Sequence, residues 1–276
     1  MSAIVRPPVN TKVKRDEIQH EIEQIFADFE ELEQQSHDQE SLVNRNILLI
    51  GPSKSGKTTL SHVLIDPRYV AEEFSLRSNL QTGATYDLRI HLPTSKLILN
   101  IVELTEEMIN RTYNLSEINS ECNRLDIQGF HAICFCISFD TGINGIALQS
   151  LERFIYYLGQ DRAKPHLCMI ITRCESKDDA QRDKLLDEFK NDTEHKRISE
   201  SFGRGIHFFG ALNHDDWNRA NEALIDQFET VYNYRKNLLR LIRTDIKPFH
   251  MPADQSESHR LSSISRLFFK IYNMRK

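Results

Sequence analysis

Residues 51–58 carry the strongest chemical signal in the chain. They read Gly-Pro-Ser-Lys-Ser-Gly-Lys-Thr and match the whole phosphate-loop pattern G-x-x-x-x-G-K-[ST]. In such a loop, backbone N–H groups surround the α- and β-phosphates of a nucleotide. Lys57 would reach the β- and γ-phosphates and Thr58 would ligate Mg²⁺, while Gly51 and Gly56 supply backbone conformations that a side chain would obstruct. The predicted nucleotide contacts here are Gly51, Pro52, Ser53, Lys54, Ser55, Gly56, Lys57, Thr58 and Thr59.

A second group of residues could read the base. The apolar run 167–171 predicts a buried strand, and it ends in residues 172–175, Thr-Arg-Cys-Glu. These four residues look like the [Asn/Thr]-Lys-x-Asp element that reads guanine. A carboxylate at Glu175 would accept hydrogen bonds from the guanine N1–H and exocyclic amine, which adenine cannot supply, and Arg173 would lie over the base plane. The predicted base contacts of this element are Thr172, Arg173 and Glu175.

The elements around the phosphate loop are those that the loop requires. The apolar run 47–50 precedes it as a strand, and apolar residues from Leu60 to Ile65 follow it at helical spacing. The amino end of that helix would direct its dipole at the phosphates. This context favours a functional loop over a chance match on a glycine-containing turn.

Strands and helices alternate over most of the chain. This order predicts an α/β fold in which a mostly parallel sheet lies between helices, and together with the phosphate loop it indicates a three-layer P-loop NTPase fold. Strands are predicted at 86–92 and 97–102, which form a hairpin, and at 132–139, 167–171 and 206–209. Helices are predicted at 115–127, 146–158 and 178–189, and through 224–242 with a start near Asp215 or Asp216.

The order of these parts resembles the septin-like branch of the translation-factor-related GTPases, most of all the immunity-associated (GIMAP-type) G domains. The resemblance covers about residues 44–243, and it implies a P-loop NTPase fold of the G-domain type with GTP or GDP and Mg²⁺ as the cofactors. It also implies that Gly210 and Ala211 contact the base and that Thr85, with Thr82 as its rival, senses Mg²⁺ and the γ-phosphate. Families of this type often dimerise through the nucleotide face, so a homodimer of that kind is expected. The expected metal ligands are Thr58, Thr85 and Glu103.

Two departures from the family pattern bear on catalysis. Glu103 replaces the aspartate that holds Mg²⁺ through water, and Glu106 stands where a glycine would donate its N–H to the γ-phosphate. No glutamine beside them could orient water. We therefore assign no catalytic residue and expect slow or partner-dependent GTP hydrolysis with nucleotide-dependent association. The alternatives are a pseudo-GTPase interaction scaffold, which the two glutamates favour, and an ATP-binding P-loop protein.

Extensions flank the expected G domain at 44–243. The tail and amphipathic helix at 1–43 could fold back on the domain or pair with another chain as a coiled coil. The segment 244–276 reads as a linker and a basic amphipathic helix. That helix could dock on protein, including the acidic N-terminal helix, or lie on an anionic membrane surface.

Composition narrows the class of protein. The 276 residues are 39% hydrophobic and 27% charged, as in globular proteins, and no secretory signal or membrane span is visible, so a cytoplasmic location is expected. The net charge of −5 argues against a nucleic-acid surface. The five cysteines are expected to be reduced core residues, with a metal at Cys134 and Cys136 as the alternative, and His131 and His207 to be packed or surface residues rather than catalysts.

Overall fold

One mixed sheet dominates the computed structural model, which describes residues 11–37, 41–71, 86–104, 122, 126–142 and 145–252. Its spatial order is β2-β3-β1-β4-β5-β6. The hairpin partners β2 and β3 are antiparallel, and the other neighbours are parallel, which confirms the predicted mostly parallel sheet. The strands are β1 (Val43–Ile50), β2 (Tyr86–Leu92), β3 (Leu97–Glu103), β4 (Ala132–Ser138), β5 (Leu167–Thr172) and β6 (Ile206–Phe208).

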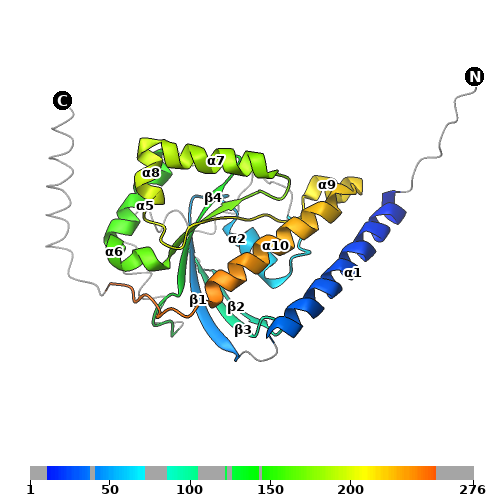
Figure 1. Cartoon of the computed structure of the whole chain (residues 1–276), viewed down its shortest axis with the longest axis horizontal. Helices are drawn as coiled ribbons and strands as arrows, with labels where there is room; N and C mark the ends of the chain where they lie inside the picture. Colours follow the sequence, from blue (N-terminus) through cyan, green and yellow to red (C-terminus); the bar gives the residue numbers. More distant parts are fainter. Residues whose placement is uncertain are drawn as a thin grey trace, which may run out of the picture.

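Helices cover both faces of the sheet (Figure 1). Alternate residues of β1 point to opposite faces: Leu48 belongs to the cluster that includes α5, whereas Ile47 and Leu49 belong to the cluster that includes α2 and α10. The α/β arrangement of a sheet between helices is therefore confirmed. The helices are α1 (Thr11–His37), α2 (Lys57–Ile65), α5 (Gly145–Leu158), α6 (Gln160–Ala163), the 3₁₀ turn η1 (Lys164–His166), α7 (Asp179–Asn191), α8 (Thr193–Ser199), α9 (His214–Arg219) and α10 (Ala223–Arg243).

The sheet grows in two directions from β1. This strand pairs in parallel with β3 on one side and with β4 on the other. In open α/β sheets, ligands bind outside the carboxyl ends of the strands at the point where the strand order reverses. The loop that follows Ile50 begins at this point, so the topology places residues 51–56 at the general ligand position of such a sheet.

The long C-terminal helix begins later than predicted. Asn213, rather than Asp215 or Asp216, is a helix N-cap, and its side chain accepts hydrogen bonds from both of those backbone N–H groups at 2.9 and 3.1 Å. The short α9 then ends at Ala220, which has the left-handed backbone conformation of a helix terminus. The main helix α10 starts only at Ala223.

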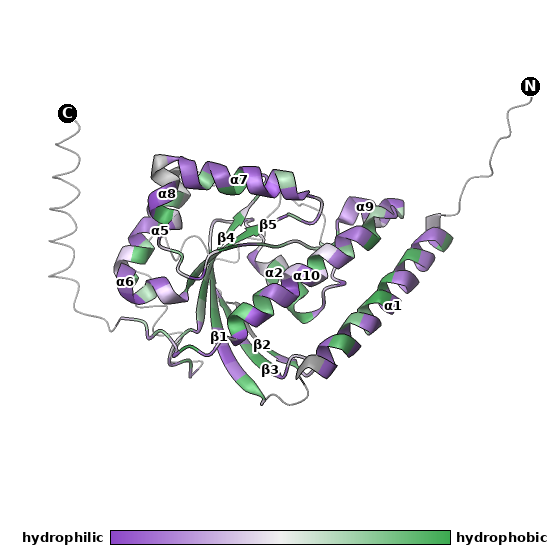
Figure 2. Cartoon of the chain, viewed as in Figure 1, coloured by the Kyte–Doolittle hydropathy of each residue, from purple (hydrophilic) through white to green (hydrophobic). Residues whose placement is uncertain are grey.

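The N-terminal helix α1 folds back on the same chain. It lies beside α10 in Figure 1, and Ile18 and Ile22 are buried with Leu224 and Phe228 of that helix. Figure 2 shows apolar residues on α1 alternating with hydrophilic ones, as an amphipathic helix requires. Of the two predicted arrangements, the structure thus has the intramolecular one.

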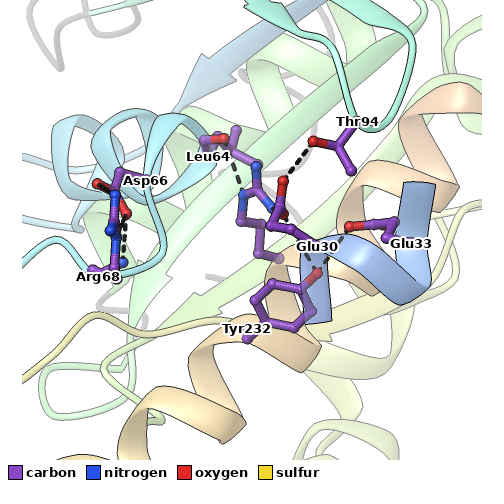
Figure 3. A network of polar contacts seen from close by, with 8 residues as sticks. Glu30, Glu33, Leu64, Asp66, Arg68, Thr94 and Tyr232 are labelled. Atoms are coloured by element: carbon purple, nitrogen blue, oxygen red, sulfur yellow. Dashed lines mark hydrogen bonds and ion pairs between the residues drawn. The ribbon is translucent and has the colours of Figure 1, made fainter. Parts of the chain in front are cut away.

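Polar contacts add to this docking (Figure 3). The Tyr232 hydroxyl donates to Glu33 Oε2 at 3.0 Å, and the hydroxyl of Thr94, in the β2–β3 turn, donates to Glu30 Oε2 at 2.5 Å. Arg235 of α10 donates through Nε to the carbonyl of Leu64 at the end of α2 at 3.1 Å. The hydroxyl of Tyr232 thus hydrogen-bonds α10 to α1.

The segment after α10 is packed where it can be described. Phe249 is buried and forms an antiparallel bridge with Phe130, so the first part of the expected linker lies against the domain. The predicted basic helix falls within residues 253–276, outside the described residues. The same is true of Thr82, Thr85, Glu106 and most of the helix expected at 115–127.

Among the described residues, no helix is both long and apolar enough to cross a bilayer.

The five cysteines form no disulfide and are buried, as predicted. Cys134, Cys136 and Cys168 lie in β4 and β5, and the Sγ atoms of Cys134 and Cys168 are 3.3 Å apart. Burial raises the pKa of the Cys136 thiol above its usual value. The Cys136 thiol is therefore a protonated core group at neutral pH.

His131 and His207 are structural residues. His131 Nδ1 accepts the Asn46 N–H at 3.0 Å where β1 meets β4, and His207 Nε2 lies 2.7 Å from the carbonyl of Arg204. Burial, followed by the nearby charge of Arg45, lowers the pKa of His131 from 6.5 to about 4. Both histidines are thus packed, as the sequence indicated.

We expect acid to destabilise the fold through His131. Between its ordinary pKa of 6.5 and the folded value of about 4, the unfolded chain binds a proton that the folded chain does not, so stability falls as the pH drops through this window. The variant His131→Asn keeps a side-chain acceptor for the backbone N–H of Asn46 but does not titrate. Its unfolding free energy, measured by urea titration between pH 4 and 7, should change less with pH than that of the wild type. The two slopes should differ by at most about 1.4 kcal/mol per pH unit. Equal slopes for both proteins would contradict this.

Candidate functional site

The loop after β1 can only be built with glycine at two positions. Gly51 has φ +146°, and a Cβ there would lie 2.2 Å from the Cys136 carbonyl oxygen. Gly56 has φ +83°, and a Cβ there would lie 2.9 Å from Thr172 Oγ1. Side chains would therefore clash with β4 and β5, and the loop backbone packs directly against the carboxyl ends of these strands.

Thr172 joins this loop to the predicted base element. Its hydroxyl lies 2.9 Å from the carbonyl oxygen of Ser55 and 3.1 Å from that of Ile137. The Ser55 hydroxyl is itself buried, and no described residue is its hydrogen-bond partner. Thr172 is the first residue of the 172–175 element, so its hydrogen bond to Ser55 joins the predicted base element directly to the phosphate loop.

Lys57 turns back across the loop. Its ammonium group donates to the carbonyl oxygens of Gly51 at 3.0 Å and Pro52 at 2.9 Å, and the residue is only 6% exposed. A buried ammonium is costly unless anionic or carbonyl oxygens surround it. Lys57 also opens α2, whose amino end is oriented towards the same loop. Two sources of positive potential thus meet at one point.

Two of the three expected metal ligands are adjacent. Thr58 donates its hydroxyl to Glu103, whose two carboxylate oxygens lie 3.0 and 3.1 Å away. Burial raises the pKa of Glu103, while the charge of Lys57 and the Thr58 hydrogen bond act in the opposite direction. A hydroxyl and a carboxylate are oxygen ligands that suit Mg²⁺. The third expected ligand, Thr85, lies outside the described residues.

Replacing Glu103 with glutamine should stabilise the protein in the absence of nucleotide. The raised pKa means that the fold favours the protonated carboxyl, so its stabilising effect is present at acid pH and lost as the pH rises past the ordinary value. Glutamine is uncharged throughout and can still accept from Thr58. Urea midpoints should be higher for Glu103→Gln at pH 7.5 and converge with wild type near pH 4. A lower midpoint at pH 7.5 would contradict this reasoning.

The base element is a tight turn. The Lys177 N–H donates to the Cys174 carbonyl oxygen at 3.2 Å, which places Glu175 inside the turn. Its Oε2 is buried and has no hydrogen-bond partner among the residues that the structure describes. Burial raises the pKa of Glu175, although backbone N–H groups of Glu175 and Ala211 counteract this effect. A Cβ on Gly210 would lie 2.6 Å from Oε2, so the predicted base contacts Glu175, Gly210 and Ala211 are in fact neighbours.

Arg173 has a strained backbone beside this turn. Its φ of +62° is unusual for a residue with a side chain, and such strain costs on the order of 1–3 kcal/mol and concentrates at functional sites. The guanidinium pairs with Asp140 at 3.3 Å, with both side chains partly exposed. Asp140 was missed in the sequence, although a polar residue just after the apolar run 132–139 is a detectable signal.

The remaining predicted contacts lie at the loop surface. Ser53, Lys54 and Thr58 are exposed, and Pro52 and Thr59 are partly exposed. Lys54 has φ +63°, so its backbone is strained as well, inside the loop 51–56.

Comparison with protein-family profiles and with curated proteins finds no match to this chain. Its chemistry must therefore be inferred from the site itself.

Proposed function

We propose that this protein binds the guanine nucleotides GTP and GDP with Mg²⁺, in a G domain of the P-loop NTPase type. The observation that carries the proposal is the buried Oε2 of Glu175, which has no hydrogen-bond partner among the described residues and belongs to the element that Thr172 joins to the phosphate loop. A buried acceptor without a donor costs about 1–3 kcal/mol, and the guanine N1–H and amine supply the missing donors. Adenine presents no such pair of donors.

Each group has a distinct part in this proposal. Backbone N–H groups of the 51–56 loop and the amino end of α2 hold the phosphates, and Lys57 exchanges its loop carbonyls for phosphate oxygens. Thr58 and Glu103 would hold Mg²⁺, and the bound ion would neutralise phosphate charge. Arg173 lies over the base and Gly210 and Ala211 close its edge. The reversal of strand order at β1 is the general ligand position for such a sheet.

Hydrolysis is proposed to be slow or dependent on a partner, because positioning and charge stabilisation supply most of phosphoryl-transfer catalysis. Nucleotide-dependent association, including a homodimer through the nucleotide face, and a cytoplasmic location belong to the same proposal.

One observation favours a second candidate, an interaction scaffold that makes little use of metal. Thr58 and Glu103 already hydrogen-bond one another, and Glu103 is partly buried. Mg²⁺ would have to compete with this contact. The two candidates differ in whether Mg²⁺ strengthens nucleotide binding.

The nucleotide carried by the purified protein distinguishes these candidates. We expect acid extraction and chromatography to release GDP or GTP from wild type and from Lys190→Ala, a matched substitution at an exposed lysine of α7. Lys57→Ala should release none. Adenine nucleotide would support the ATP-binding alternative, and guanine nucleotide retained equally in Mg²⁺ and EDTA would support the scaffold.

A further inference from the structure

The turn that carries Glu175 is supported from outside the site. The Cys174 carbonyl oxygen accepts the Lys177 N–H, and it lies 3.4 Å from the Tyr234 hydroxyl. At the other end of the turn, the Lys177 carbonyl oxygen accepts from Arg182 Nη1. Both flanking carbonyls of the turn are therefore bound by side chains of two other elements, α10 and α7.

Tyr234 and Arg182 also hold one another. Arg182 Nη1 donates to the Tyr234 hydroxyl oxygen at 2.8 Å, which leaves the hydroxyl hydrogen directed to Cys174. Burial raises the pKa of Tyr234 to about 12, so the hydroxyl keeps its proton at neutral pH. We call Tyr234 and Arg182 the turn clamp.

The turn clamp also reaches the second base-contacting segment. The Arg182 guanidinium carbon lies 5.9 Å from the ring centre of Phe208 in β6, two residues before Gly210. The Cys174 N–H donates to the Phe209 carbonyl oxygen at 2.9 Å. Hence the clamp fixes the Glu175 turn relative to the strand that leads to Gly210.

We propose that Tyr234 and Arg182 are positioning residues for guanine selectivity, which they set by holding the Glu175 turn against β6. The proposal rests on the function proposed above. Neither side chain belongs to the phosphate loop, whose contacts run through Thr172 and Lys57. Removing contacts of the turn clamp should therefore reduce the selectivity for guanine while leaving the phosphate contacts in place.

Tyr234→Phe tests this with the loss of one oxygen atom. Tyr232→Phe is the matched control, because it removes the same atom from the same helix, where the hydroxyl contacts Glu33 of α1 (Figure 3). Dissociation constants for GDP, IDP and ADP in Mg²⁺ buffer would be measured for wild type and both variants. IDP lacks the exocyclic amine and so makes one of the two hydrogen bonds to Glu175.

We expect Tyr234→Phe to reduce the preference for GDP over ADP about fivefold or more, the equivalent of one lost hydrogen bond. The preference for GDP over IDP should also fall, and affinity for ADP should stay within about twofold. Tyr232→Phe should keep the wild-type ratios. Because each ratio compares two ligands on one variant, a fraction of unfolded protein does not change it.

Arg182→Lys is a second variant. It keeps the charge but loses the planar group that bonds both Lys177 and Tyr234, so its GDP preference should fall in the same way. Wild-type ratios in Tyr234→Phe and Arg182→Lys, or an equal fall in Tyr232→Phe, would overturn the clamp while leaving guanine binding intact. A wild-type protein that binds GDP and ADP equally would overturn the clamp and the proposed function together.

Discussion

Lys57→Ala should lower the affinity for guanine nucleotide by about 100-fold or more. The lysine is buried and bonds two carbonyl oxygens of the loop, and a charged hydrogen bond contributes about 1.5–3 kcal/mol, with at least two such bonds expected to phosphate. Loss of about 3 kcal/mol corresponds to roughly two orders of magnitude. Equilibrium titration with a fluorescent GDP derivative measures the effect.

Lys190→Ala is the control for this substitution, since that side chain is exposed on α7. Circular dichroism and urea midpoints must accompany both titrations, because Lys57 also bonds the Gly51 and Pro52 carbonyls and its removal alters the loop. A folded Lys57→Ala protein that binds GDP as tightly as wild type would show that the nucleotide does not contact this loop.

Glu175→Gln should change which base the protein prefers. The carboxylate only accepts hydrogen bonds, whereas a glutamine amide accepts one and donates one. Guanine presents two donors at this edge, but xanthine has an N–H and a carbonyl oxygen, which match the amide. Two hydrogen bonds to a charged group are worth about 3–6 kcal/mol, so GDP should bind about 100-fold more weakly or worse. XDP should bind the variant more tightly than GDP.

Competition between GDP and XDP measures this change, with Glu188→Gln as the control because Glu188 is an exposed glutamate of α7. Glu175→Gln should also be no less stable than wild type in the absence of ligand, because burial raises the pKa of Glu175 and disfavours its charged form. Unchanged GDP affinity in this variant would remove Glu175 from the base site and leave adenine nucleotides as candidates.

Much of the fold follows from local sequence patterns. The runs at 132–139 and 167–171 are apolar on both faces because β4 and β5 are central strands, so their assignment as buried strands is confirmed. The predicted start of the long C-terminal helix was wrong because a separate short helix, α9, precedes it. The Asn213 side chain caps the beginning of α9 and the left-handed Ala220 ends it, and these local features compete closely with continuation of one helix.

The site was only partly predictable. Motif spacing indicated Lys57, Thr58 and the two glycines, because a phosphate-binding loop requires particular residue types at fixed positions. Arg182 and Tyr234 have no motif because their contact depends on how α7 and α10 pack, and the sequence separation of 52 residues hides it. The direct contact between Glu103 and Thr58 likewise depends on the pairing of β1 with β3.

The most direct measurement of the central claim is calorimetric titration of the full chain with GDP, GTP and ADP in Mg²⁺ buffer. Guanine nucleotides are predicted to bind with micromolar or tighter dissociation constants, and ADP about 100-fold more weakly or worse, because guanine would offer the Glu175 carboxylate two donors that adenine lacks. Equal affinity for GDP and ADP, or no binding of either nucleotide, would contradict it.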